Sequence, residues 1–156
     1  MKPVSTWLSE YGESHQHPLN KRIHWICVPL IMLSLVALLS LLPLKLDLLN
    51  QYPILNNWGF GLVVLASIYY FFLSIPLFAG MIPVSALLLF ATDLLSSLPF
   101  PLWKTAFTIF VGAWIGQFYG HKIEGKKPSF LKDIQFLLIG PLWLLSKLYR
   151  RYGITY

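Results

Sequence analysis

Long apolar runs separated by short polar segments dominate the chain. Two of these runs are VPLIMLSLVALLSLLPL at 28–44 and GLVVLASIYYFFLSIPLFAG at 61–80. A helix needs about 20 apolar residues to cross a bilayer. The pattern therefore predicts an all-α integral membrane protein whose helices form a bundle.

Turn-forming residues divide the apolar sequence into four predicted transmembrane helices. The first runs from about Leu19 to Leu42–Pro43, the second covers about 58–75, the third ends near Leu98, and the fourth covers about 103–120. The polar linker 43–57 joins the first two spans. Pro76, Gly80 and Pro83 predict a break and a short turn before the third span, because proline and glycine interrupt helices.

The N-terminal residues predict a short amphipathic helix over 5–14. It is expected to lie on the membrane, because Trp7 and Tyr11 favour the headgroup layer. Pro18 suits the first turn of the next helix, with His17 on its cap side.

The last apolar run, Ile134–Leu148, is too short for an easy crossing and carries Gly140-Pro141 in its middle. It predicts a re-entrant or interfacial segment. The length of the chain allows one domain, so residues 1–156 are expected to form a single membrane-embedded domain.

Composition agrees with a membrane protein and argues against a soluble one. Hydrophobic residues make up 56% and charged residues only 12% of the sequence, whereas about a quarter of residues are charged in soluble domains. The formal charge of +6 does not indicate nucleic acid binding, because the basic residues lie beside apolar runs and are better explained as orienting charges.

The basic residues also predict the orientation. With four spans, both termini lie on one side, and every Lys and Arg except Lys45 and Lys104 lies on that side. The positive-inside rule therefore places both termini in the cytoplasm, for a protein of the bacterial inner membrane or the endoplasmic reticulum.

The histidines gather at the same predicted edge of the membrane. His15, His17 and His24 lie close together in the sequence, and His121 follows the fourth span. Imidazole is a ligand for Zn, Cu, Fe and Ni, and the spacing does not choose among them. The alternative is that they are interfacial side chains bonded to water or lipid phosphate.

Carboxamides and a carboxylate accompany two of these histidines at helical spacing. Asn20 and His24 share one helix face, and Gln117, His121 and Glu124 share another. Such groups can supply the hydrogen bonds that orient metal-bound histidines.

The fourth span also carries a stripe of small residues at Gly112, Gly116 and Gly120. A stripe of this kind lets another helix approach closely. It either packs inside the chain, against the helix that bears His24, or joins two copies in a homo-oligomer.

Two polar blocks resemble those of a known family. They read YGESHQHPLNKRIHWICVPL at 11–30 and WIGQFYGHKIEGKKPSFL at 114–131. In order, and separated by apolar spans, they resemble the membrane 2-hydroxy fatty acid dioxygenases over nearly the whole chain.

The resemblance implies Fe(II)-dependent α-oxidation, in which a long-chain 2-hydroxy fatty acid and O2 give a fatty acid one carbon shorter and carbon dioxide. The implied catalytic and metal-binding residues are His15, His24 and His121, accompanied at the cofactor by Asn20, Gln117 and Glu124. His17 either completes the metal shell or is solvated. Two other classes stay open: a non-catalytic lipid-binding or scaffold protein, and a metal or proton carrier.

Overall fold

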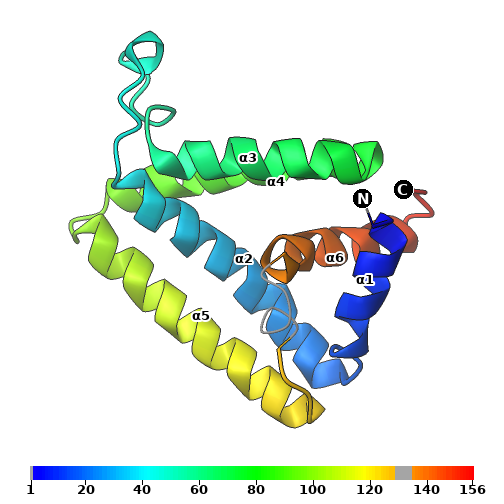
Figure 1. Cartoon of the computed structure of the whole chain (residues 1–156). Coiled ribbons are helices and arrows are strands. Elements are labelled where there is room, and N and C mark those ends of the chain that lie inside the picture. The colour runs from blue at the N-terminus through cyan, green and yellow to red at the C-terminus, as the bar shows by residue number, and fades with distance from the viewer. Residues whose placement is uncertain (1, 129–134) are drawn as a thin grey trace.

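The chain folds into helices joined by connections of different lengths, the long one between α2 and α3 at 41–57 (Figure 1). The computed structural model describes residues 2–128 and 135–156. Its helices are α1 (Val4–Glu13), α2 (Pro18–Ser40), the 3-10 turn η1 (Asp47–Leu49), α3 (Trp58–Leu73), α4 (Ile75–Ser96), α5 (Leu102–Glu124) and α6 (Phe136–Arg151). The all-α expectation is confirmed for these residues.

Two of the four expected spans have the length and hydropathy of a crossing helix. They are α2, with 23 residues, and α4, with 22. At 16 residues, α3 is apolar but shorter. The polar residues of α5 lower its hydropathy, because it carries Lys104 near its start and Gln117, His121 and Lys122 near its end.

Helix starts follow the local chemistry of the sequence. Pro18 occupies the first turn of α2, and Nδ1 of His17 accepts a hydrogen bond from the Leu19 N–H at 3.2 Å, as the sequence predicts. The side chain of Asn57 caps α3 in the same way, through the Phe60 N–H.

The break expected near Pro76 is confirmed, because α3 ends at Leu73 and α4 begins at Ile75. The turn expected at Gly80 and Pro83 is wrong, because both residues lie inside α4. Pro76 is in the first turn, where the missing N–H costs no helical hydrogen bond. Gly80 serves a helix contact: a Cβ there would collide with Oη of Tyr149 on α6.

The C-terminal segment forms one continuous helix that includes Gly140 and Pro141. Residue 134, where this segment was expected to begin, lies outside the described residues. α6 packs against α1 (Figure 1) and also contacts α4 and α2. The rings of Trp7 and Phe136 meet edge to face at 5.3 Å.

The helices α2 and α5 run antiparallel and pack side by side (Figure 1). Gly116 and Gly120 bring the two helices together: a Cβ at Gly116 would lie 2.6 Å from Sγ of Cys27, and one at Gly120 would collide with Oδ1 of Asn20. Gly112 has nothing within 4 Å of its Cβ position. Two of the three glycines of the stripe therefore contact α2 within the chain. Only Gly112 is available for contact with a second copy.

Large apolar side chains remain exposed along the outer faces of the helices. Examples from α3, α4 and α5 are Phe72 (69% exposed), Leu87 (65%) and Ile115 (65%). Exposed apolar surface of this extent marks contact with a membrane or a partner.

Substitution of the glycines tests the α2–α5 contact. Gly120→Ala should lower the free energy of unfolding by about 1–3 kcal/mol, because the added methyl overpacks a tight helix contact. Gly112→Ala is the matched control, and it should be neutral or raise stability by roughly 0.5–1 kcal/mol through helix propensity. Thermal unfolding in detergent measures both, and equal shifts would contradict this packing.

Candidate metal centre

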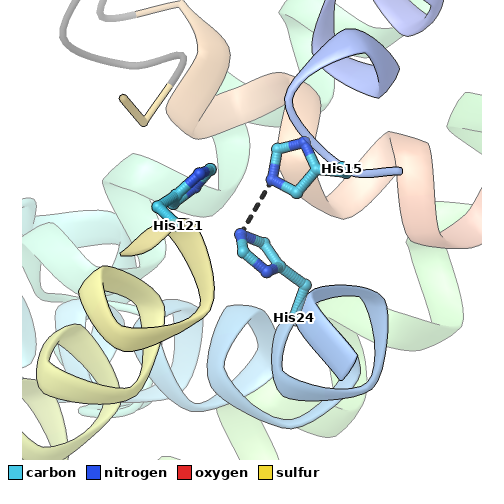
Figure 2. Close-up of side chains that lie close together, drawn as sticks. All are labelled: His15, His24 and His121. Atoms are coloured by element: carbon cyan, nitrogen blue, oxygen red, sulfur yellow. Dashed lines mark hydrogen bonds between the residues drawn. The ribbon is translucent and has the colours of Figure 1, made fainter. Parts of the chain in front are cut away.

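Three histidines from distant parts of the sequence meet at one end of the α2–α5 pair (Figure 2). His15 comes from the connection between α1 and α2, His24 from α2, and His121 from the last turn of α5. Each offers a ring nitrogen, and these nitrogens all lie within 4.8 Å of one another. All three side chains are at least 95% buried.

Backbone carbonyls determine which ring nitrogens of His15 and His24 carry protons. Nδ1 of His15 lies 2.6 Å from the carbonyl oxygen of Tyr11, and Nδ1 of His24 lies 2.9 Å from that of Asn20. A carbonyl oxygen only accepts, so both Nδ1 atoms must donate. Each neutral ring therefore presents an unprotonated Nε2.

These two Nε2 atoms face each other at 2.8 Å (dashed line in Figure 2). A direct hydrogen bond between them would require one ring to be a charged imidazolium. Burial, and next the adjacent His24, lower the pKa of His15 to about 3, so His15 is neutral near pH 7. Two neutral acceptors at this distance form a site that could bind a cation.

His121 is the third histidine of this group. Its Nδ1 is buried and has no hydrogen-bond partner among the described residues, and its ring centroid lies 4.9 Å from that of His15 and 5.0 Å from that of His24. Buried polar atoms are rarely left unpaired. Three converging imidazoles, one of which has an unpaired nitrogen, could hold a first-row transition metal, although imidazole alone does not select one.

Aromatic packing holds the His15 ring in place. The Tyr11 ring stacks on it at 4.2 Å and 9°, and the Trp143 ring lies 5.2 Å away. The contact of Trp143 with His15 was not predicted from the sequence, because no spacing relates α6 to the histidine blocks. A tryptophan beside apolar residues carries no local sign of such a role.

Glu124 and Asn20 hold the loop that carries His15 and lie outside the three-histidine group. The Glu124 carboxylate accepts hydrogen bonds from the N–H groups of Gln16 and His17, both at 2.8 Å, and from Nδ2 of Asn20 at 3.1 Å. Asn20 Nδ2 also donates to the carbonyl of Ser14 at 3.1 Å. Burial acts to raise the pKa of Glu124, but these donors outweigh it and lower that pKa.

The other two predicted site residues differ in their placement. Gln117 is buried, lines the cavity at the histidines and hydrogen-bonds the His24 ring. His17 is exposed, caps α2 and is not part of the three-histidine group.

A cavity of about 40 Å³ adjoins the three histidines. Apart from Gln117 and the histidines, its walls are mostly apolar and come from four helices: Tyr11 of α1, Val28, Ile31 and Met32 of α2, Trp114 of α5, and Phe136, Leu137 and Gly140 of α6. An apolar wall beside a polar centre is typical of sites for amphipathic ligands.

The fold and the site define a class: an all-α protein with two helices apolar enough to cross a membrane and a buried three-histidine centre suited to a metal. The family described as 2-hydroxy-palmitic acid dioxygenase Mpo1-like matches residues 1–152, and the chain belongs to this family. Neither the curated proteins nor the solved structures contain a significant match to it.

His15 and His17 form a matched pair for testing the centre. His15→Ala should reduce bound metal to well below one ion per chain, because it removes a converging nitrogen. His17→Ala should keep the metal and lose no more than about 1 kcal/mol of helix capping. Cobalt(II) titration followed by its absorption spectrum measures both; equal retention in the two variants would exclude His15 as a ligand.

Glu124 should influence metal binding through the His15 loop. Glu124→Gln is expected to weaken cobalt(II) binding by about 10–100-fold, as changes next to metal ligands do. It should also speed amide hydrogen exchange at Gln16 and His17, since their acceptor loses its charge. Lys122→Gln, on an exposed neighbouring residue, is the control and should change neither quantity.

Proposed function

We propose that this protein is an iron-dependent dioxygenase that shortens long-chain 2-hydroxy fatty acids by one carbon at a membrane. One observation carries the proposal: the unprotonated nitrogens of His15 and His24 face each other in a buried site that His121 completes. The family, described by 2-hydroxy-palmitic acid dioxygenase activity, supplies the substrate class. A purely structural scaffold would not need buried imidazoles that lack a proton between them.

The overall reaction balances without an external reductant. A 2-hydroxy acid and O2 yield the shortened acid, carbon dioxide and water. The C1–C2 bond breaks, C2 becomes the new carboxyl carbon, and C1 leaves as carbon dioxide. C2 gives up three electrons and C1 gives up one, and these four electrons reduce O2.

The three histidines would act as neutral ligands that leave the full positive charge of Fe(II) to attract an anionic substrate. Bound Fe(II) would supply Lewis acidity toward the carboxylate and hydroxyl, together with the redox chemistry of O2. Burial favours this role, because a ligand imidazole must be unprotonated and His15 is neutral near pH 7.

The adjoining cavity suits the polar end of the substrate. Its volume of about 40 Å³ exceeds the roughly 10–15 Å³ that a cavity needs to hold one water. It has room for the carboxylate and C2 but not for a long acyl chain. Gln117, which lines the cavity, would donate its amide to the carboxylate, while the apolar walls would contact the first methylenes. The rest of the chain would continue along apolar helix surfaces into lipid.

A membrane location fits both the substrate and the exposed apolar side chains of the helices. We propose that α2 and α4, assisted by α3 and α5, cross the bilayer with both termini in the cytoplasm. The histidines would then lie at the cytoplasmic edge, where a fatty acid has its carboxylate in water and its chain in lipid.

Turnover of a defined substrate tests the function. Anaerobically purified, iron-loaded protein given 2-hydroxypalmitate and O2 should release pentadecanoic acid and carbon dioxide, which mass spectrometry measures. His24→Ala and His121→Ala should each lower turnover by more than about 100-fold, while His17→Ala should remain active. Palmitate, which lacks the hydroxyl, is the control substrate and should not be consumed. Absence of shortened acid from iron-loaded wild-type protein would reject the proposal.

A further inference from the structure

A second cavity, of about 270 Å³, lies between α1 and α6. Its lining is mostly polar and includes the hydroxyls of Ser5 and Ser9 from α1 and the cationic side chains of Lys147 and Arg150 from α6. Ser5 and Ser9 are one helical turn apart, as are Lys147 and Arg150, so each pair shares a face. The metal centre uses none of these four residues.

Aromatic rings hold both cations in position. Nζ of Lys147 lies 5.0 Å from the centre of the Trp143 ring. Nε of Arg150 donates a hydrogen bond to Oη of Tyr156 at 2.8 Å, and the guanidinium lies 5.9 Å from the Tyr156 ring. Cation–π contacts fix the direction of a side chain without neutralising its charge. Both groups therefore keep donors for a ligand at little further cost in side-chain entropy.

The positive charge of the cavity is only partly balanced by acidic side chains. Over residues 2–128 and 135–156 the ion pair within contact distance is Lys2–Glu10, which involves neither Lys147 nor Arg150. Glu13 contributes a carboxylate to the lining, against two cations there. Burial, followed by the nearby charges of Arg150 and Lys21, lowers the pKa of Lys147, as expected where cations gather without a counterion.

The surroundings of the cavity indicate the form of the anion. On α6 and the segment that follows, Leu148, Tyr152 and Ile154 are 40–70% exposed, so apolar surface follows Lys147 and Arg150 closely in the sequence. A ligand with a phosphate and attached acyl chains satisfies both features. Basic pockets on the cytoplasmic side of membrane proteins bind the headgroups of anionic lipids in this way.

We propose that the cavity between α1 and α6 is a binding site for the phosphate of an anionic phospholipid headgroup. Lys147 and Arg150 provide charge-assisted hydrogen bonds to the phosphate oxygens, and Ser5 and Ser9 donate from the opposite wall. The bound lipid would hold the α1–α6 pair against the cytoplasmic leaflet. This site is independent of the dioxygenase reaction.

Lipid binding to the full chain tests the proposal. Native mass spectrometry of delipidated protein in detergent, titrated with dioleoyl phosphatidylglycerol, should give a dissociation constant about tenfold or more lower than that of the double variant Lys147→Gln/Arg150→Gln. Lys45→Gln/Lys104→Gln is the matched control. It removes the same charge elsewhere in the chain, and Lys104 also lies over a tryptophan ring, at 5.5 Å. The control should bind the lipid like the wild type, and unchanged thermal unfolding and cobalt(II) binding would show that both variants are folded.

Two further ligands distinguish a lipid site from a site for a soluble anion. Dioleoyl phosphatidylcholine, in which a choline cation offsets the phosphate, should bind more weakly than phosphatidylglycerol. The soluble headgroup analogue sn-glycerol 3-phosphate should compete only at much higher concentration, because it lacks acyl chains. Equal loss of binding in both double variants would overturn the proposal as non-specific charge attraction. Binding of sn-glycerol 3-phosphate as tight as that of the lipid would instead assign the cavity to a soluble phosphate ester and overturn the lipid site.

Discussion

The structure depends on how two buried imidazoles are oriented. His15 and His24 each donate the Nδ1 proton to the carbonyl oxygen of the residue four positions earlier. The same type of backbone contact therefore sets the orientation of both rings. It leaves two Nε2 lone pairs pointing at each other. In a buried site this arrangement could accept a cation at the meeting point. The remaining contacts of the fold keep the two rings in an orientation that suits a metal, which accounts for their burial as a pair.

Three sets of contacts hold those rings together, and each comes from a different part of the fold. The α2–α5 contact at Gly116 and Gly120 brings the end of α5, and with it His121, against α2. The Glu124 carboxylate accepts hydrogen bonds from the backbone N–H groups of the loop that follows His15. The α1–α6 pair adds the rings that pack on His15. The site is thus assembled by helix packing, which explains why small residues and hydrogen-bonding side chains gather at this end of the molecule.

The polar and apolar surfaces divide the molecule in a way that suits an enzyme acting on lipids. Exposed apolar side chains cover α3, α4 and α5, whereas the histidine centre and the cationic cavity both involve the α1–α6 pair. Trp143 connects the two sites, because it packs near His15 and also under Lys147. In the proposed arrangement, the α1–α6 pair faces the headgroup layer and also packs against the metal centre.

The sequence alone determined the helical class, most helix positions and the two polar blocks, because hydropathy and capping are local properties. The start of α2 at Pro18, with His17 as its cap, is one example. The roles of other residues were decided only by tertiary structure. Nearly every position inside the helices is apolar, so periodicity could not show which face meets which neighbour, and Gly80 was mistaken for a turn although it admits Tyr149. The spacing predicted that Glu124 shares a helix face with His121. Its hydrogen bonds to the loop after His15 were decided only by the packing of α5 against that loop, because they join residues more than 100 positions apart.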